Sequence, residues 1–292
     1  MNGVINIFKN KGMTSFDVVR IVKKIANTKK VGHTGTLDPE ASGVLPICIG
    51  KGTKIIDYIM SSDKSYYVKF KLGIETTTYD LEGEIISEKD ISSLNSEMIL
   101  KEIGNFKGEY MQIPPMYSAL KKNGVRLYDL ARQGIEIERE GRKVNIIDIK
   151  NINIELPYVS MEVTCSKGTY IRSLCKDIGD NLKVGGTVVE LRRTVTASFK
   201  EEDSININDL TQENITDYLI PIEKALKSYP KLHINKGFSK LLINGVKVYD
   251  KRLTNVEVVN DALYRVYDEK NNFIGLGKKD GEGFKIEKLL VV

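Results

Sequence analysis

The spacing of apolar and polar residues along the chain predicts both strands and helices. Residues 3–8 form a short apolar run typical of a strand, and residues 66–72 alternate between polar and apolar positions. Between them, apolar residues recur at helical spacing from 18 to 25, so we expect a helix that Ser15 caps. The same patterns predict a helix at 97–106 and a proline-marked loop followed by a helix at 112–134. They also predict two strands within 143–165, on either side of Pro157, and a strand at 187–199. A helix is expected from Thr169 to about Leu182.

The pattern changes after Pro221. A short helix is expected before Pro230, and short strand-like runs then alternate with Gly and Asn turns to the C-terminus. These runs are VKVY, LYRVYD, FIGLG and FKIEKLLVV. Regular strand-and-turn spacing predicts a small β-rich unit. We therefore expect an α+β chain with a larger domain at 1–229 and a smaller one at 230–292.

Composition and charge narrow the class of protein. The 292 residues are 41% hydrophobic, enough for a sizeable core, and Lys and Arg exceed Asp and Glu by 44 − 39 = 5. That excess favours a polyanionic partner, although the lysines at 23–30 fit a solvated helix end as well as phosphate contacts. Three cysteines without a C-x-x-C pair argue against a disulfide framework or a zinc ribbon. We expect a cytoplasmic protein, because no stretch reaches the ~20 apolar residues of a membrane helix and the N-terminus lacks a signal peptide's apolar run.

Residues 31–54 are dense in Gly, Thr and Ser and interrupt the regular pattern. Within GHTGTLDPEASGVL, Pro39 pushes the backbone of Asp38 toward the extended region, so a carboxylate stands on a tight loop of small residues. An ordinary turn in which Asp38 bonds its own backbone also fits this segment. GKGTK at 50–54 does not match the phosphate-binding loop, which requires Gly-Lys-Ser/Thr.

Two further segments carry candidate polar groups. In TCSKGTYIRSL, Arg172 falls in the first helical turn, where a cation opposes the helix dipole unless it meets an anion or points into water. Tyr170 fits either a core position or a platform for RNA bases. In KSYYVKFKLG, Tyr66 and Tyr67 point to opposite faces of a strand, and spacing alone does not choose which one lines a cleft.

Five blocks in order along residues 3–200 resemble the bacterial tRNA pseudouridine-55 synthase (TruB) family. They are GHTGTLDPEASGVLPICIGKGTK, KSYYVKFKLG, QIPPMYSALKKNGVRLYDLARQG, TCSKGTYIRSLCKDIG and VVELRRT. Ordered blocks over this length are far more specific than any single motif. The resemblance implies a pseudouridine synthase fold, with a mixed and mainly antiparallel sheet flanked by helices, an insertion at about 90–143 and a C-terminal PUA-like RNA-binding domain. One departure is Phe8-Lys9-Asn10, where members often carry Asp-Lys-Pro.

The resemblance also implies roles for single residues. Asp38 is expected to be the catalytic aspartate, Arg172 its ion-pair partner, and Tyr66 the tyrosine that stacks on the target base and serves proton transfer. The implied substrate-binding residues are His33, Tyr66, Tyr170, Leu191 and Asp80. His33 is expected to help extrude the nucleotide, and Tyr170 and Leu191 to line the uridine pocket. Asp80 is expected to be a carboxylate that supports the arginine.

The implied reaction is the isomerisation of uridine 55 in the T loop of tRNA to pseudouridine. It breaks the N1–C1′ bond, turns the base and rejoins it through C5, so no cofactor and no metal are expected. A carboxylate can stabilise or trap the cationic sugar carbon. A bidentate Arg172 would keep Asp38 ionised in a largely dry pocket. The expected partner is the T arm of tRNA, from which the target nucleotide is flipped out. The enzyme is expected to be a monomer, with no membrane and no protein partner implied.

Two other functions remain open from the sequence. The basic surface and the C-terminal unit also fit an RNA-folding chaperone, a role that can coexist with catalysis. The alternative enzyme is a guide-RNA-dependent pseudouridine synthase that acts on rRNA. The compact length and the insertion block argue against a guide-dependent enzyme.

Overall fold

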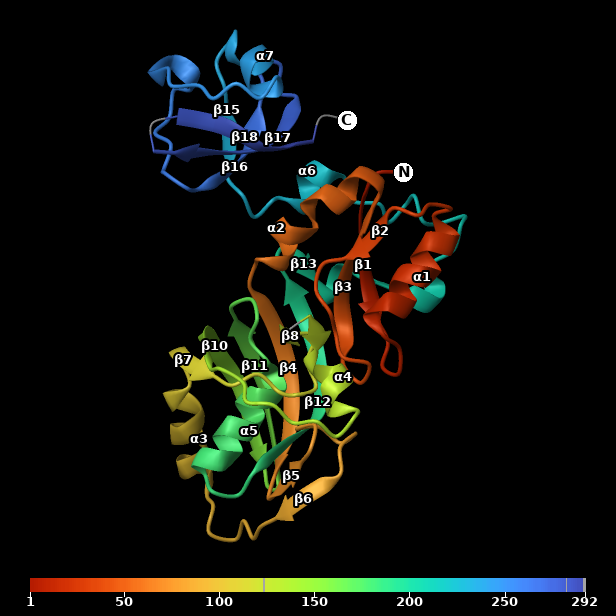
Figure 1. Cartoon of the computed structure of the whole chain (residues 1–292), viewed down its shortest axis with the longest axis vertical. Helices are drawn as coiled ribbons and strands as arrows, with labels where there is room; N and C mark the ends of the chain where they lie inside the picture. Colours follow the sequence, from red (N-terminus) through yellow and green to blue (C-terminus); the bar gives the residue numbers. More distant parts are fainter. Residues whose placement is uncertain (123, 282, 291–292) are drawn as a thin grey trace.

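The computed structural model describes residues 1–122, 124–281 and 283–290. Most of the chain forms one ten-stranded mixed sheet with helices packed on it, and the C-terminal residues form a separate four-stranded sheet (Figure 1). The strands of the large sheet are β1 (Gly3–Lys9), β2 (Val31–His33), β3 (Ser42–Ile49), β4 (Lys64–Leu72), β7 (Gly108–Gln112), β10 (Arg142–Glu155), β11 (Tyr158–Cys165), β12 (Gly186–Thr196), β13 (Phe199–Lys200) and β14 (Ile205–Asn206).

The large sheet is mainly antiparallel, which confirms the expected fold class. Its order is β14-β1-β3-β12-β4-β11-β10-β7, with β2 paired to β3 and β13 paired to β12. β14 runs parallel to β1 and β12 runs parallel to β3, whereas β4 is antiparallel to both of its neighbours. The strands predicted at 3–8, 66–72, 143–165 and 187–199 are all present.

The strand β3 was not anticipated by the sequence patterns. All of its residues except Ser42 are buried, so both faces are apolar and the polar–apolar alternation of a half-exposed strand is missing. Gly43 and Pro46 within it are residues that usually weaken a strand assignment. The strand nevertheless pairs with β1 along its whole length.

Helices flank the large sheet. α1 packs near β2 and β3, α5 packs on β12 and β4, and α3 lies against β10 and α5. The helices are α1 (Ser15–Ile25), α2 (Ile56–Met60), α3 (Ser96–Asn105), α4 (Leu127–Ala131), α5 (Ile171–Asn181), α6 (Ile222–Ala225) and α7 (Phe238–Ile243), with short 3-10 turns η1 (Gly50–Ile55), η2 (Glu201–Asp203), η3 (Ile207–Asp209) and η4 (Lys251–Leu253).

Two helix starts differ from the sequence prediction. Thr14, not Ser15, caps α1, because its side chain accepts from the Asp17 N–H while the Asp17 carboxylate accepts from the Thr14 N–H. The predicted start at Thr169 lies two residues too early, since α5 begins at Ile171 and Tyr170 occupies its cap position without a side-chain hydrogen bond. Arg172 still falls in the first turn, as expected.

The segment at about 90–143 contributes the strand β7 to the large sheet, together with the helices α3 and α4 and the small strand pair β8–β9. Its helix α3 leads into β7, which pairs with β10 at the sheet edge. The helix expected within 112–134 shortens to the five residues of α4, and position 123 lies outside the described residues. The small paired strands are β5 (Ile74–Thr76) with β6 (Ile85–Glu88), and β8 (Lys121–Lys122) with β9 (Val125–Arg126).

The C-terminal unit packs on the start of the chain through a shared apolar cluster. Leu276 and Leu290 join Leu226 of the linker region and Val4 of β1 in that cluster. Its sheet is β15 (Lys231–His233), β16 (Leu263–Tyr267), β17 (Phe273–Asp280) and β18 (Gly283–Leu289). The strand expected from VKVY is wrong, because Val248 makes only an isolated bridge to Phe284. Within the described part of the chain, helices long and apolar enough to cross a membrane are absent.

Candidate active site

Asp38 lies in the loop between β2 and β3, where side chains from two other segments hold the backbone. Ser15 Oγ accepts a hydrogen bond from the Leu37 N–H at 2.8 Å and donates one to the Leu37 carbonyl at 3.0 Å. The ammonium of the fully buried Lys9 donates to the Pro39 carbonyl at 3.1 Å. The residues on both sides of Asp38 are therefore fixed, which limits where its carboxylate can lie.

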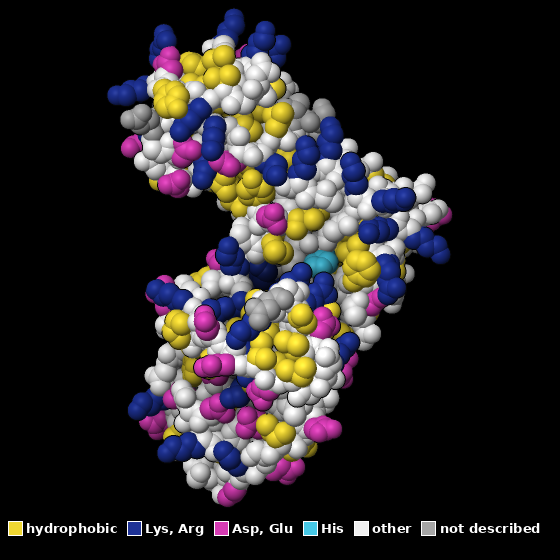
Figure 2. All heavy atoms as spheres, in the orientation of Figure 1, with side chains coloured by type: hydrophobic (Ala, Val, Ile, Leu, Met, Phe, Trp, Pro, Cys, Tyr) yellow, Lys and Arg dark blue, Asp and Glu magenta, His cyan; other side chains and the backbone are white. Residues whose placement is uncertain are grey.

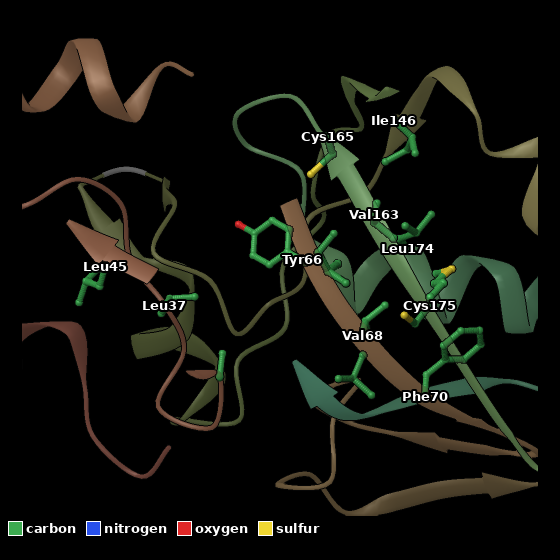
Figure 3. Close-up of a cluster of buried hydrophobic side chains, with 14 of the residues drawn as sticks. Leu37, Leu45, Tyr66, Val68, Phe70, Ile146, Val163, Cys165, Leu174 and Cys175 are labelled. Atoms are coloured by element: carbon green, nitrogen blue, oxygen red, sulfur yellow. The ribbon is translucent and has the colours of Figure 1, made fainter. Parts of the chain in front are cut away.

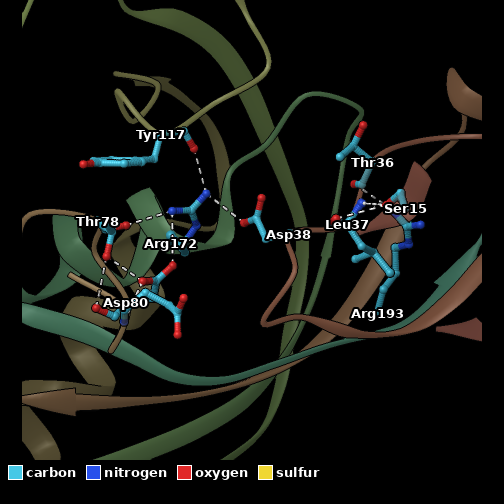
Figure 4. Close-up of polar contacts among 10 residues, drawn as sticks. Ser15, Thr36, Leu37, Asp38, Thr78, Asp80, Tyr117, Arg172 and Arg193 are labelled. Atoms are coloured by element: carbon cyan, nitrogen blue, oxygen red, sulfur yellow. Dashed lines mark hydrogen bonds and ion pairs between the residues drawn. The ribbon is translucent and has the colours of Figure 1, made fainter. Parts of the chain in front are cut away.

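Arg172 is the centre of a polar cluster that Figure 4 shows between Asp38 and Asp80. Its Nη2 lies 2.8 Å from Oδ2 of Asp38, and its Nη1 lies 3.2 Å from Oδ2 of Asp80. The same two nitrogens donate at 2.9 Å to the carbonyls of Tyr117 and Thr78. The guanidinium side chain is only 6% exposed, so it is oriented by protein groups on several sides.

Two details of this cluster differ from the sequence expectation. Arg172 is not bidentate toward Asp38, because its Nη1 contacts the second carboxylate, Asp80. The Asp38 side chain is 39% exposed, so its surroundings in the free protein are not dry. Asp38 thus has one oriented partner and an open side, the arrangement that a ligand can complete.

Asp80 is held in a tight turn between β5 and β6. Its Oδ1 accepts from the Thr78 hydroxyl at 2.5 Å and from the Glu82 N–H at 3.1 Å, which leaves Oδ2 for Arg172. Tyr79 has a positive φ of 63°, so this turn has the left-handed residue that a sharp reversal uses. The family resemblance placed Asp80 among the substrate-binding residues. In the structure its carboxylate contacts Arg172, and its side chain is 15% exposed.

Tyr66 projects from β4 into the main core cluster, and Tyr67 projects from the other face. Figure 3 shows the ring beside Val68, with its hydroxyl directed toward the side of Leu37 and Leu45. Burial raises the pKa of Tyr66 to about 12, although the positive charge of Arg193 opposes this shift. The phenol is therefore protonated near neutral pH. Tyr66 is 8% exposed, so it is the one of the two tyrosines that faces the interior.

His33 ends β2 and is half-buried next to the Asp38 loop. Its Nδ1 accepts from the Gly35 N–H at 3.3 Å, so the neutral ring carries its proton on Nε2. Burial, and then the charge of Arg193, lower the pKa of His33. A neutral imidazole held by its own loop can present one N–H and an apolar edge to a base.

Tyr170 is fixed by a buried glutamine. The Tyr170 N–H donates to Gln112 Oε1 at 2.8 Å, and the Tyr170 carbonyl accepts from Gln112 Nε2 at 3.0 Å. The guanidinium of Arg142 lies 4.7 Å from the centre of the Tyr170 ring. Two of its buried nitrogens, Nε and Nη2, have no hydrogen-bond partner among the described residues.

Leu191 on β12 completes a small pocket beside the carboxylate. The pocket has a volume of about 70 Å³, and Asp38, Asp80, Arg172, Val188 and Leu191 are among its lining residues. A larger depression of about 430 Å³ lies at the far end of β4, between residues 71–74 and 88–91, and none of the expected site residues lines it. The structure therefore brings Asp38, Arg172, Asp80 and Leu191 to one pocket.

Several residues of this site were not anticipated. Ser15, Lys9 and Arg193 hold the Asp38 loop, while Gln112 and Arg142 surround Tyr170. Adjacent residues of a strand face opposite sides, so the double arginine in VVELRRT already signalled that one guanidinium points inward. No comparable pattern marks Ser15 or Gln112. Metal-binding clusters of His, Cys, Asp or Glu are not found among the residues that the structure describes.

Lysine and arginine side chains lie on both sides of a hollow in the surface (Figure 2). Figure 2 shows a hollow between the C-terminal unit and the large domain, with Lys and Arg side chains along its walls. Lys24, Lys29 and Lys30 near the end of α1 are exposed, as are Lys121 and Lys122 of β8. Exposed lysines of this kind can contact phosphates without reading sequence.

Fold and sequence together place the chain among pseudouridylate synthases. Residues 23–171 match the family model of the TruB family pseudouridylate synthase N-terminal domain, and residues 172–227 match that of the tRNA pseudouridylate synthase B C-terminal domain. The chain belongs to the TruB family. The family resemblance and the expected enzyme class, an isomerase that makes pseudouridine, are confirmed.

Relatives and solved structures agree with this assignment. The chain is 59% identical over its whole length to "tRNA pseudouridine synthase B" of Clostridium perfringens, covering 99% of that protein, and equally identical to the Clostridium tetani protein of the same name, covering all of it. A Cbf5-Nop10-Gar1 complex superimposes with a TM-score of 0.77 at 29% identity, covering 98% of this chain and 84% of that one. An H/ACA RNP bound to a substrate RNA containing 2′-deoxyuridine has a TM-score of 0.75 at 27% identity, covering 99% and 85%.

Proposed function

We propose that this chain isomerises uridine 55 in the T loop of tRNA to pseudouridine, without a cofactor. The observation that carries the proposal is the Arg172–Asp38 contact of 2.8 Å at an open pocket, in a chain of the TruB family. The full-length relatives named tRNA pseudouridine synthase B support tRNA as the substrate. Asp38, Tyr66 and Arg172 are the proposed catalytic group.

Asp38 is the proposed nucleophile or charge stabiliser. When the N1–C1′ bond breaks, the sugar carbon becomes electron-deficient, and a carboxylate beside it stabilises or traps it. The base turns and bonds to C1′ through C5; C5 loses its proton and N1 gains one, so the product is an isomer. Arg172 favours the ionised form of Asp38 and fixes its direction, since the two side chains are 2.8 Å apart.

Tyr66 is the proposed base platform and proton-transfer group. Its burial keeps it protonated near neutral pH, because its pKa is raised to about 12. A protonated phenol can donate to the rotating base and accept the C5 proton only after its own proton has moved on. This role requires an electrostatic neighbour that stabilises the oxygen, and Arg193 is placed for that.

Substrate binding is proposed to cover the exposed side of Asp38. A flipped nucleotide would occupy the pocket against Leu191 and the Tyr170 ring, with His33 helping to hold it out of the loop. The 39% exposure of Asp38 would then fall, which strengthens its electrostatic effect on the sugar. Asp80 contributes through Arg172.

The remaining proposals concern the assembly. Residues 1–229 are proposed to be the catalytic domain and 230–292 a PUA-like domain that contacts RNA, because the basic hollow lies between them (Figure 2). The enzyme is proposed to act as a cytoplasmic monomer on the T arm, with no protein partner. Its free, buried Cys48, Cys165 and Cys175 suit a reducing compartment.

The direct test incubates the purified chain with unmodified tRNA and no guide RNA, then maps the modified nucleotide. Pseudouridine at position 55 alone is the expected result. Product at another position, or a stoichiometric need for a guide RNA, would replace this proposal with the rRNA-type alternative. The structural similarity to the H/ACA particle is what keeps that alternative in the test.

A second role as a tRNA-folding chaperone is favoured by the basic hollow. Asp38→Asn protein separates the two roles, because it lacks the catalytic carboxylate and keeps the binding surface. If this variant still accelerates the folding of a misfolded tRNA, folding assistance is independent of isomerisation. Folding at the uncatalysed rate would remove the second role.

A further inference from the structure

Arg193 of β12 is a buried cation that forms no ion pair with a carboxylate in the described part of the chain. It is 1% exposed, and its Nε donates to the Val44 carbonyl at 2.7 Å. Its Nη2 and Nη1 donate to the carbonyls of Gly35 at 3.1 Å and Thr36 at 3.4 Å. In residues 1–122, 124–281 and 283–290 its guanidinium forms no ion pair. Burying a guanidinium without an ion pair is costly, so a compensating role for the charge is expected.

Two of these acceptors belong to the loop that carries Asp38. Gly35 and Thr36 precede Asp38 by three and two residues, and Figure 4 shows Arg193 below the Thr36–Leu37 segment. Together with Lys9, which holds the Pro39 carbonyl from the other side, Arg193 clamps this loop between two buried cations.

The backbone at this point is built for close approach. Arg193 pairs with Gly43 of β3, whose φ is +107°. A Cβ atom at Gly43 would lie 2.2 Å from the Arg193 carbonyl, so only glycine fits. β12 and β3 therefore lie in close contact at this point, which fixes the position of the Arg193 guanidinium relative to the Asp38 loop.

Arg193 also faces Tyr66 across the sheet. β12 and β4 pair Arg193 with Tyr66, and the neighbouring Arg192 with Tyr67. The positive charge of Arg193 lowers the pKa of Tyr66, against the larger upward effect of burial. Arg192, on the opposite face, lies 5.3 Å from the Tyr67 ring centre and 2.6 Å from Glu201.

We propose that Arg193 is a positioning residue for the isomerisation, which clamps the Asp38 loop through the Gly35 and Thr36 carbonyls and places a fixed positive charge beside the Tyr66 hydroxyl. The charge stabilises the Tyr66 oxygen while its proton is displaced, and the clamp keeps Asp38 aligned with the same oxygen. The inference rests on the proposed isomerisation, which wild-type product formation tests separately.

The test compares Arg193→Gln and Arg193→Lys with the matched control Arg192→Gln. Single-turnover rates on unmodified tRNA and tRNA dissociation constants are measured for each. Arg193→Gln is expected to lower the rate by about 100-fold while the dissociation constant changes by less than about 3-fold, since misalignment costs rate rather than binding. Arg193→Lys keeps the charge and is expected to recover about 10-fold of this loss. Arg192→Gln is expected to react like the wild type.

A double-mutant cycle with Tyr66→Phe distinguishes positioning from a general structural role. If Arg193 acts through Tyr66, Arg193→Lys lowers the rate less in the Tyr66→Phe background than in the wild type. Fully additive losses overturn the proposal, as does a rate of Arg193→Gln within 2-fold of wild type. A loss of tRNA binding in step with rate in both Arg193 variants also overturns it. If Arg193→Gln does not fold, the Arg193→Lys cycle decides alone. A wild-type chain that makes no pseudouridine contradicts the proposed function instead.

Discussion

Nη2 of Arg172 lies 2.8 Å from Oδ2 of Asp38, and these two residues are 134 positions apart in the chain (172 − 38). One comes from a loop after β2 and the other from the first turn of α5. A guanidinium at the start of a helix opposes the helix dipole, and the carboxylates of Asp38 and Asp80 offset that cost. The contact thus explains why an arginine stands at this position.

Asp80 should control the rate through Arg172. Asp80→Asn removes one of the two negative charges that contact the guanidinium, so Arg172 is held less firmly against Asp38. We expect the single-turnover rate to fall about 10- to 100-fold with tRNA affinity unchanged. Glu84→Gln, an exposed change near the same turn, is the control. An Asp80→Asn enzyme with wild-type rate would show that Asp38 and the Thr78 and Tyr117 carbonyls orient Arg172 without Asp80.

Tyr66 and Tyr67 provide a matched pair on one strand. Tyr66→Phe removes the hydroxyl beside Arg193 and should lower the single-turnover rate by at least about 100-fold. Tyr67→Phe removes a hydroxyl on the other face, where Arg192 packs on the ring, and should leave the rate near wild type. Equal rates for the two variants would argue that the phenol oxygen takes no part in proton transfer.

Thr14 and Ser15 are neighbours with different expected effects. Thr14→Ala removes the cap of α1 and should lower the free energy of unfolding by about 1 kcal/mol without changing the rate of the folded enzyme. Ser15→Ala leaves the Leu37 N–H and carbonyl without their partner and should slow the reaction about 10-fold. Urea unfolding and single-turnover assays on both variants check this. A slower Thr14→Ala and an unaffected Ser15→Ala would reverse the assignment.

Stability should rise with pH between about 8 and 10 because of Lys9 and Lys64. Burial lowers the pKa of each from 10.5 to about 8. In this window the unfolded chain still holds protons that the folded chain has released, so the free energy of unfolding increases with pH. Lys64→Met should show a smaller increase between pH 7.5 and 9.5 than wild type, measured by urea unfolding. The exposed Lys101→Met should behave as wild type, and an unchanged slope in Lys64→Met would contradict the shift.

The sequence predicted the local elements better than the packing of the site. Spacing identified β4, α1 and β12, because these elements have one exposed face. It missed β3, which is buried on both faces, and it misplaced the cap of α1, since Thr14 and Ser15 are both capable caps. The pair of Asp38 and Arg172 was expected from a family resemblance and a charge argument, and it is present.

The parts of the site that sequence reasoning missed depend on long-range contacts. Lys9 and Ser15 act by hydrogen bonds to loop carbonyls, which no spacing rule encodes. Strand alternation in VVELRRT indicates that one arginine points inward, but not that Arg193 holds the Asp38 loop. The exposed side of Asp38 was also unforeseen, because the exposure of a loop side chain depends on how distant segments pack around it. A prediction of these features requires the tertiary fold.

The measurement that tests the central claim most directly is the single-turnover formation of pseudouridine by Asp38→Asn. The carboxylate at position 38 carries the proposed chemistry, and the amide keeps its shape without its charge. We expect no product above background, a tRNA dissociation constant within about 3-fold of wild type and an unchanged fold. Product formation by Asp38→Asn at the wild-type rate would contradict the account.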